Sequence, residues 1–512
     1  MQNLDKSKVV FKDYNFNQNL LLPPSLEELI APNHPVRIVS QVVDNLNLDP
    51  ILDKYDGGGC PAYHPRMMLK VLVYGYMTNR YSSRKIEEAL QQNIHFMWLS
   101  GMSYPDHNTI NRFRSDRLKG VLREVFSQVV HLLIDHGHIT LKEAYLDGTK
   151  IEANANRYTF VWGKTIKYNR GRIRNQLKEL WSYAEQVAKE EMEHNEPESF
   201  KEIDAEKVSQ AIDKIDKALT GKEVDKKVKQ KLNYAKRKWP EALDKYESYE
   251  RQLGDRNSLS RTDPDATFMR MKEDHMLNGQ LKPGYNLQIS TQDQYILGYT
   301  LHQTAGDTAT LPEHIDTLRQ SLGQVPEVMV ADAGYGSEEN YKYLEDNNVE
   351  AYVKFNYFHK EQSKQWKENP SKPENLYYNE QEDCYYCPMG QKMTFIGTRA
   401  RTTANGYKQI NNRYQAANCK GCPMRGPCHK QNTNRIIEVN PQLIRYKQIV
   451  REKLNSEQGL EYRSQRPADV EAVFGHIKYN HGFKRFLLRG INKTEIEAGL
   501  VSLAHNLRKM AN

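Results

Sequence analysis

The chain has 512 residues, too many for one hydrophobic core, so we expect about three or four folded units. Its 73 Lys and Arg outnumber its 65 Asp and Glu, and the net charge of +8 permits nucleic-acid binding without proving it. The sequence has no apolar run long enough for a membrane span and begins without a signal-peptide core, so we expect a cytoplasmic protein with no membrane partner.

Residues 1–136 are predicted to form a helical region. Ser25, with Glu28 three residues later, has the pattern of a helix N-cap. Patterns of apolar spacing and helix-starting residues predict further helices over residues 64–76, 82–90, 105–114 and 118–136.

Basic side chains gather in this region, and the third of these short helices is basic. The succession resembles a helix-turn-helix module, in which Arg84, Arg112 and Arg114 would contact DNA. The alternative is a plain helical domain whose arginines are solvated. The DNA-binding interpretation requires these side chains to share one surface.

A strand and a helical insertion are predicted next. The stretch 139–153 has strand character, and Asp147 ends an apolar run within it, followed by a glycine. A long polar insertion covers residues 157–259, where apolar residues keep helical spacing on both sides of Thr220-Gly221, so we expect a helical hairpin broken there. Its charge run is better explained as a solvated face than as a DNA groove.

The remaining strands and helices predict an α/β unit. Alternating or buried apolar runs predict strands over residues 284–291, 295–302, 327–332 and 350–355, with helices over 310–322 and 337–347. Three strands followed by helix, strand, helix and strand resemble the order of a ribonuclease H-like domain, here made of residues 139–156, 260–360 and 456–512. In that fold the first and fourth strands are neighbours, so Asp147 and Asp332 would meet.

Most of the cysteines lie in residues 361–440, which we expect to form a small insertion. Cys384 and Cys387 form one Cys-x2-Cys pair and Cys419 and Cys422 another, a spacing suited to a structural, tetrahedral zinc ion. Either Cys428 or His429 could replace one of these four ligands. Cys60 stands alone after three glycines and is interpreted as a loop thiol.

A helix is predicted to start at Arg466-Pro467 and to end before Gly482. Glu471 and Lys478 are seven residues apart on it, about two turns, so they would lie on one face. Its buried stripe would comprise Val470, Val473, Phe474 and Ile477.

The carboxylates of Asp147, Asp332 and Glu471 come from separate elements. Two divalent ions that act on a phosphodiester need hard oxygen ligands that converge in the fold, and this set would supply them. Taken singly, each carboxylate is better explained as a solvated or capping residue. The three together, with a lysine after the glutamate, favour a metal-dependent site for phosphoryl transfer.

Nearly the whole chain resembles the transposases of bacterial insertion sequences of the DDE class, in the group whose glutamate helix carries a Tyr, Arg, Glu, Lys signature. The motifs that carry the resemblance are Tyr63-His64-Pro65-Arg66, Ser83-Arg84-Lys85-Ile86-Glu87, Pro105-Asp106-His107-Asn108-Thr109, Leu146-Asp147-Gly148-Thr149-Lys150, Asp263-Pro264-Asp265-Ala266, Gly284-Tyr285-Asn286 and Ala331-Asp332-Ala333-Gly334-Tyr335.

The resemblance implies that Asp147, Asp332 and Glu471 hold two Mg²⁺ or Mn²⁺ ions and that Lys478 touches the DNA backbone. It also implies DNA cutting at terminal inverted repeats, transfer of the 3′ hydroxyl ends into target DNA, and a homodimer on DNA. The spacing around the signature departs from the usual pattern. The roles of Tyr462 and Arg466 are therefore open, and Arg463 competes with Arg466.

Two other functions are compatible with the same residues. A nuclease with this catalytic core would cut DNA without joining strands. A domesticated DNA-binding protein would recognise a sequence without cutting it.

Overall fold

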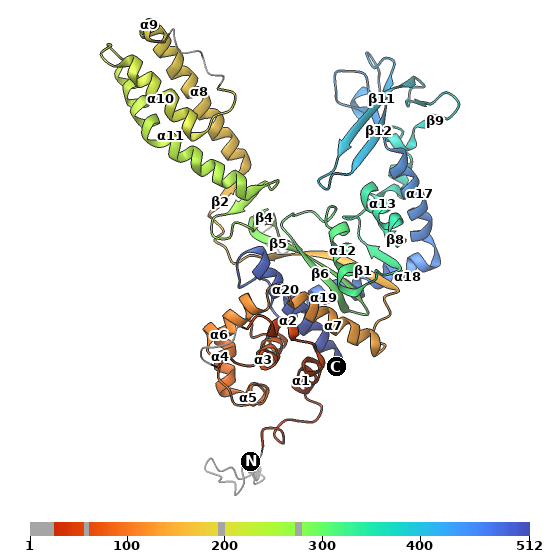
Figure 1. Cartoon of the computed structure of the whole chain (residues 1–512). Coiled ribbons are helices and arrows are strands. Elements are labelled where there is room, and N and C mark those ends of the chain that lie inside the picture. Colours follow the sequence, from red (N-terminus) through yellow and green to blue (C-terminus); the bar gives the residue numbers. More distant parts are fainter. Residues whose placement is uncertain (1–24, 56–60, 193–199, 272–278, 512) are drawn as a thin grey trace, which may run out of the picture.

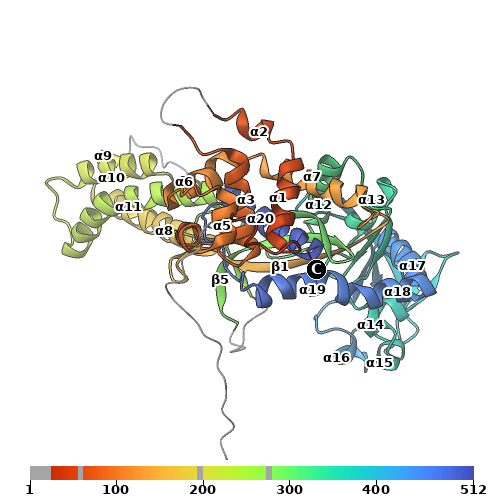
Figure 2. The ribbon, with the colours of Figure 1, turned by 90° about the horizontal axis from the view of Figure 1, so that it is seen from below.

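The computed structural model describes residues 25–55, 61–192, 200–271 and 279–511, so Cys60 lies outside the described residues. Figure 1 shows a central sheet from which two arms project to the same side, while the N-terminal helices pack at the opposite end. The same arms extend to opposite sides of the molecule when it is seen from below (Figure 2). Among the described helices, none is both long and apolar enough to cross a bilayer.

The N-terminal region is helical, as predicted, but it begins differently. Ser25 accepts a hydrogen bond from the backbone N–H of Glu28 at 3.3 Å, and the residues that follow form only a turn. The first helix starts ten residues later, with the side chain of His34 as its N-cap. The helices are α1 (Pro35–Asn45), α2 (Asp49–Leu52), α3 (Pro65–Met77), α4 (Ser83–Gln92), α5 (Ile94–Ser100), α6 (His107–Arg112), the π-helical turn η1 (Phe113–Arg117) and α7 (Leu122–Asp135).

The central sheet has the strand order β4-β5-β1-β7-β8, and β6 also pairs with β5. Its strands are β1 (Glu143–Glu152), β4 (Thr267–Arg270), β5 (Leu281–Gln292), β6 (Tyr295–His302), β7 (Val328–Ala331) and β8 (Glu350–Val353). β1 is antiparallel to β5 and parallel to β7, and β7 is parallel to β8. The predicted adjacency of the first and fourth strands is confirmed, although β4 was not foreseen.

Helices cover both faces of this sheet. On one face Leu318 of α12 (Leu311–Leu322) lies against Gly298 of β6. On the other, α20 (Ile491–Met510) approaches so closely that a Cβ at Gly499 would lie 2.4 Å from the Tyr299 hydroxyl. A larger residue at this position would force the Tyr299 or Leu122 side chain to move. The helix α13 (Glu338–Asp346) connects β7 to β8.

The first arm is the helical insertion, which contains one more long helix than the predicted hairpin. It consists of β2 (Phe160–Trp162), α8 (Gly163–Val187), α9 (Lys189–Met192), α10 (Ala205–Leu219), α11 (Lys226–Leu253) and β3 (Ser258–Ser260). The predicted break is confirmed, because α10 ends at Leu219 with Thr220 as its C-cap. The arm has its own hydrophobic core, built around Trp181, Ile212 and Trp239.

The second arm contains the cysteines and an antiparallel sheet of order β13-β12-β11-β10-β9. Its elements are α14 (Phe358–Glu361), α15 (Lys364–Lys367), η2 (Pro373–Asn375), β9 (Tyr377–Asn379), β10 (Cys384–Tyr386), β11 (Lys392–Thr402), β12 (Lys408–Ala416), α16 (Arg425–Cys428) and β13 (Ile436–Val439). The helix α17 (Pro441–Asn455) then returns the chain to the central sheet.

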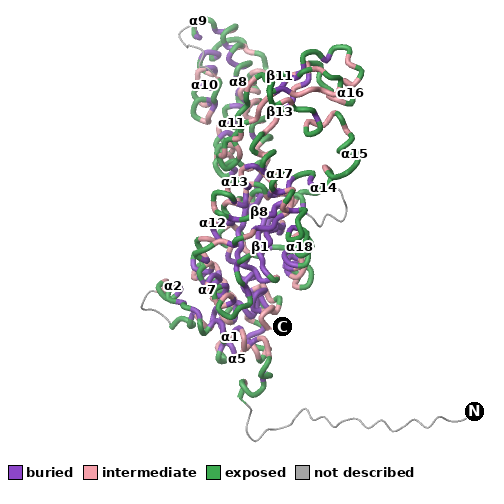
Figure 3. Tube along the Cα trace, turned by 90° about the vertical axis from the view of Figure 1, so that its right-hand side faces the viewer, coloured by how far each residue is buried: buried purple, intermediate pink, exposed green. Residues whose placement is uncertain are grey.

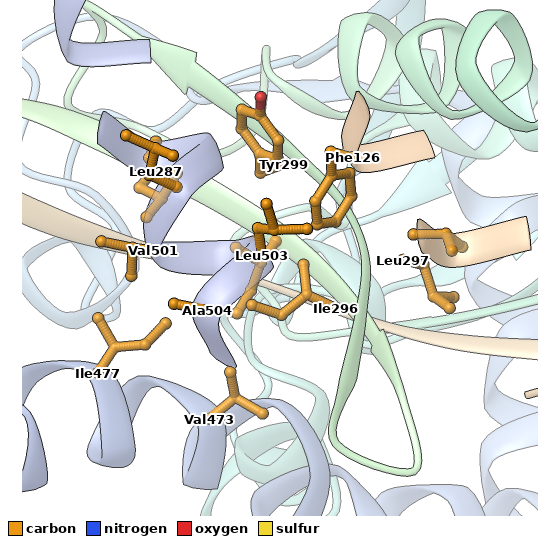
Figure 4. Packing of buried hydrophobic residues seen from close by; sticks show 14 of the residues in the cluster. Phe126, Leu287, Ile296, Leu297, Tyr299, Val473, Ile477, Val501, Leu503 and Ala504 are labelled. Atoms are coloured by element: carbon orange, nitrogen blue, oxygen red, sulfur yellow. The ribbon is translucent and has the colours of Figure 1, made fainter. Parts of the chain in front are cut away.

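The N-terminal helices and the sheet share one continuous hydrophobic core. Figure 4 shows its centre, where Phe126 of α7 and Tyr299 of β6 meet Leu503 of α20, with Val473 and Ile477 from the helical segment that carries Glu471 nearby. Figure 3 shows the same distribution along the chain, with buried residues concentrated in the sheet and the helices around it.

Arg114, predicted to contact DNA, is instead buried in this core, with 2% of its surface exposed. Its Nη1 donates to the Tyr76 hydroxyl at 3.1 Å and lies 4.0 Å from a carboxylate oxygen of Glu497 on α20. Burial raises the pKa of Glu497. The prediction that Arg114 contacts DNA is therefore wrong, because its guanidinium is buried against Tyr76 and Glu497.

The other basic residues of the region differ in their partners. Arg84 and Arg112 are exposed, whereas Lys70 pairs with Asp44 and Arg117 stacks over Tyr55. Only Arg84 and Arg112 of the three predicted DNA contacts remain available at the surface.

We expect Arg114→Met to destabilise the fold by about 3 kcal/mol, because it leaves a buried carboxylate without its cation. Arg112→Met, two residues away but exposed, should change the free energy of unfolding by less than about 0.5 kcal/mol. Urea denaturation of both variants measures the two free energies of unfolding. Equal stability of the two, with weaker DNA binding only for Arg114→Met, would contradict the assignment of Arg114 to the core.

Candidate active site

Asp147 and Asp332 lie on neighbouring parallel strands at the same level of the sheet. Leu146 of β1 is paired with Ala331 of β7, and each is followed by its aspartate. Asp147 is buried, whereas Asp332 is partly exposed just beyond the end of its strand. The backbone N–H of Gly334 donates to Asp332 Oδ1 at 2.7 Å and holds that carboxylate in place.

Glu471 is carried by a helical segment that runs without a break from Glu457 to Asn480. It consists of α18 (Glu457–Arg466), a π-helical turn η3 (Pro467–Glu471), α19 (Ala472–Gly475) and a second π-helical turn η4 (His476–Asn480). Pro467 therefore lies inside this segment and does not start it, which corrects the prediction. The wider π turn accommodates a residue that cannot donate a backbone hydrogen bond.

The predicted buried stripe of this segment is confirmed, since Val470, Val473, Phe474 and Ile477 are all buried. Polar contacts fix its position on the sheet. Asp469 accepts hydrogen bonds from Thr291 Oγ1 and from the backbone N–H of Gln294, in the turn between β5 and β6. The segment is therefore docked where Glu471 faces β1.

Arg466 joins two of the three predicted carboxylates. Its Nη2 lies 3.0 Å from Asp147 Oδ1 and its Nη1 lies 2.8 Å from Glu471 Oε1. The guanidinium side chain is 8% exposed, as is that of Asp147, whereas half of the Glu471 side chain is exposed. Asp147 and Glu471 therefore converge on a single positive centre.

The alternative arginine has a different place. Arg463 Nη1 donates to the carbonyl of Leu454 at 3.0 Å, and its guanidinium stacks over Phe358. Tyr462 packs edge-on against Tyr145 and Tyr352. Arg466 is thus the signature residue that reaches the carboxylates, while Tyr462 and Arg463 fix α18 to its surroundings.

Lys478 is buried, with 4% of its surface exposed, and its Nζ donates to the backbone carbonyl of Lys150 at 2.9 Å. This placement corrects the expected contact with the DNA backbone. A regular α-helix would have returned to the same face after seven residues, but π turns contain more residues than α turns and change the direction of the side chains that follow.

Two further polar residues at this edge of the sheet were not foreseen. Asp307 accepts hydrogen bonds from Asn286 Nδ2 at 2.7 Å and Gln288 Nε2 at 2.9 Å, and its Oδ2 would lie 3.5 Å from a Cβ at Gly334. Lys354 follows β8 directly. The sequence did contain a signal for Lys354, because it is a charged residue that directly follows a predicted strand, as Asp332 does.

Tyr335, which follows the Asp332 loop, shows how acidic this edge is. The residue is buried and its hydroxyl donates to Gln288. Burial first, and then the carboxylates of Asp307, Asp147 and Asp332, raise the pKa of its hydroxyl well above the usual range. It therefore stays a neutral hydrogen-bond donor.

The donor set fits a hard divalent cation, which prefers carboxylate oxygens. Asp147 and Glu471 already share one cationic partner, and Asp332 directly follows the neighbouring strand. Within the described ranges, no three acidic, histidine or cysteine side chains are gathered closely enough to hold a metal ion as they lie. At this site the Arg466 guanidinium lies between two of the candidate ligands.

The cysteines are arranged differently from the predicted zinc set. Cys387, Cys419, Cys422 and Cys428 line one small cavity together with His429, whereas the Cys384 thiol points to a carboxylate oxygen of Glu382 at 3.6 Å. Arg435 donates to Cys428 Sγ at 2.9 Å through Nη1 and to Cys419 Sγ at 3.3 Å through its backbone N–H. The structure thus groups Cys428, and not Cys384, with the other three.

Two family models match parts of the chain. The model of a family described as "Transposase DDE domain" matches residues 386–511, which include Arg466 and Glu471. A second family model, described as a transposase domain, matches residues 24–116. No curated protein matches the chain.

The sequence resemblance assigned Asp147, Asp332 and Glu471 to a DDE site, and the structure brings Asp147 and Glu471 onto one arginine beside the strand that Asp332 follows. The two matches, one near each end of the chain, support an insertion-sequence transposase of the DDE class. Enzymes of this class act on DNA and generally use a divalent metal such as Mg²⁺.

Proposed function

We propose that this transposase binds the terminal inverted repeats of its insertion sequence, cuts the DNA there and transfers the 3′ hydroxyl ends into target DNA. The observation that carries the proposal is the convergence of Asp147 and Glu471 on one cationic centre beside Asp332. The ribonuclease H-like order of the central strands supports it. The catalytic ligands would be Asp147, Asp332 and Glu471, for two Mg²⁺ or Mn²⁺ ions.

The divalent ions, when bound, would supply activation of the attacking oxygen and stabilisation of the leaving oxygen. The residues of the chain have separate tasks. Asp147 on the rigid sheet and Asp332, held by the Gly334 N–H, fix one side of the site. Glu471 closes it from the docked helical segment.

Arg466 must change partners for the carboxylates to take up metal. One guanidinium carries a single positive charge and so neutralises only one of the two carboxylates. A divalent ion carries two positive charges and neutralises both. Once released, the planar guanidinium is suited to bidentate contact with a DNA phosphate. We therefore assign Arg466 a DNA contact that forms as metal binds.

For the other DNA contacts, exposed Arg84 and Arg112 support a role for the N-terminal helices. Two ends must be brought together for transposition, so we also propose that the protein acts as a homodimer on DNA.

The cysteine-rich arm is proposed to hold one structural zinc ion through four of the five groups that line its cavity. The cavity supports this in two ways. Arg435 donates to two of the sulfurs, as expected for thiolates. His429 is partly exposed, but both of its ring nitrogens are buried and lack a hydrogen-bond partner among the described residues.

Metal analysis of the purified full chain should find about one zinc ion per molecule, and Cys428→Ser should lower that content severalfold, because a lost thiolate weakens a tetrahedral site. Cys384→Ser is the matched control and should keep its zinc. Loss of zinc from Cys384→Ser but not from Cys428→Ser would contradict this ligand set.

The test of the proposed function uses a labelled duplex that carries the terminal repeat of the element, incubated with the full chain in Mg²⁺ and in EDTA. The expected result is metal-dependent cutting at the repeat boundary together with a joined product. Cutting without joining would identify a nuclease, and binding without cutting would identify a DNA-binding protein.

A further inference from the structure

Lys354 lies in a row with the two catalytic aspartates. Ala331 of β7 is paired with Leu146 on one side and with Val353 of β8 on the other. Asp147, Asp332 and Lys354 are the next residues in each case, and the Lys354 N–H continues the ladder by donating to the Ala331 carbonyl at 3.2 Å. The lysine is thus the neighbour of Asp332 on the side away from Asp147.

The helical segment that carries Glu471 covers the same face of the sheet. Side chains two residues apart on a strand share a face. Tyr145 and Tyr352, two residues before Asp147 and Lys354, both pack against Tyr462 of α18. Asp147 and Lys354 are therefore expected on the face occupied by α18 and Glu471.

The backbone of Lys354 is held firmly against the Asp332 loop. A Cβ at Gly336 would lie only 2.3 Å from the Lys354 carbonyl oxygen, so this close packing requires glycine. Lys354 is accordingly positioned by the same loop that positions Asp332.

The charges around Lys354 leave it suited to an anion. Its side chain is half-buried, and burial first, then the nearby guanidinium groups of Arg466 and Arg463, lower the pKa of its ammonium. Asp332 and Glu471 act in the opposite direction. If those two carboxylates bind metal, the three basic side chains need another negative partner, and a phosphate of the bound DNA would provide one.

We propose that Lys354 contacts the DNA phosphate that is cut, and so takes the role that the resemblance gave to the buried Lys478. The proposal rests on the DNA-cutting activity proposed above. It adds a substrate-binding residue from β8 to the three carboxylates and Arg466.

The experiment compares single-turnover cutting of the terminal-repeat duplex in Mg²⁺ by wild type, Lys354→Met, Lys354→Arg and Lys342→Met. Lys354→Met keeps the length of the side chain without its charge, and we expect it to cut about 100-fold more slowly. Lys354→Arg keeps the charge and should stay within about tenfold of wild type. Lys342, which is exposed on α13 and paired with Asp346, is the control, and Lys342→Met should have no effect.

Binding of the same duplex is measured at several salt concentrations with Ca²⁺ in place of Mg²⁺, so that the carboxylates hold a cation while little cutting is expected. Loss of one phosphate contact should reduce the slope of log affinity against log salt by about 0.9. Equal melting temperatures of the variants exclude a folding defect as the cause.

The outcomes separate the two proposals. If wild type cuts and Lys354→Met cuts equally fast, the role of Lys354 is overturned and the transposase activity stands. If wild type does not cut but Lys354→Met still lowers the salt slope, the phosphate contact stands and the catalytic proposal fails. An unchanged slope with an inactive wild type overturns both.

Discussion

Asp147→Asn should bind the terminal-repeat duplex nearly as well as wild type but cut it on the order of 10⁴-fold more slowly. The substitution keeps the shape of a buried side chain and removes the charge that a divalent ion needs. Asp332→Asn and Glu471→Gln should behave in the same way, because ligands of one site act as a unit. Gel-shift binding and single-turnover cutting, measured side by side, check this.

Asp307→Asn is the informative comparison for these three variants. Asp307 is also acidic and close to Asp332, but its Oδ1 accepts hydrogen bonds from two amide side chains. We expect a much smaller loss of cutting, about tenfold, because it is assigned no metal. If Asp307→Asn were as inactive as Asp147→Asn, or if all three ligand variants lost DNA binding, the assignment of the ligands would fail.

Arg466→Met should lower the free energy of unfolding by about 3 kcal/mol in EDTA, because Asp147 would keep a buried charge without its partner. Glu471 is half exposed and should contribute little to this loss. Mn²⁺ would take the place of the guanidinium. At 100 times its Kd for this variant, it should raise the free energy of unfolding by about 2.7 kcal/mol. Urea denaturation with and without Mn²⁺ measures both effects.

Arg463→Met is the control for Arg466→Met. Its guanidinium bonds to the Leu454 carbonyl and stacks over Phe358, so the variant should also be less stable, but Mn²⁺ should stabilise it no more than it stabilises wild type. Equal Mn²⁺ stabilisation of wild type and Arg466→Met would show that the guanidinium does not compete with metal for these carboxylates.

Much of the central sheet could be predicted because its signals are local. Apolar runs that end in Asp-Gly or Asp-Ala-Gly mark β1 and β7, and the order of elements then places Asp147 beside Asp332. The stripe from Val470 to Ile477 identified the helix with Glu471 for the same reason.

The features that the sequence did not predict depend on more than the local residue pattern. Pro467 has the local pattern of a helix start, but the chain before it is already helical and the π turn accommodates it. The burial of Arg114 depends on Glu497, almost 400 residues later. The Cys-x2-Cys spacing did not show that the Cys384 thiol points to Glu382, whereas Cys387 lines the cavity with the other cysteines.

The most direct test of the central claim is a change of metal preference in Asp332→Cys. A thiolate ligand favours a softer ion than a carboxylate does. This variant should not cut the terminal-repeat duplex in Mg²⁺, and Mn²⁺ should restore part of its cutting. The gain in its cutting rate on replacing Mg²⁺ with Mn²⁺ should be about tenfold or more larger than the gain seen with wild type. Cutting by Asp332→Cys in Mg²⁺ at the wild-type rate would contradict the account, because Asp332 could not then be a metal ligand.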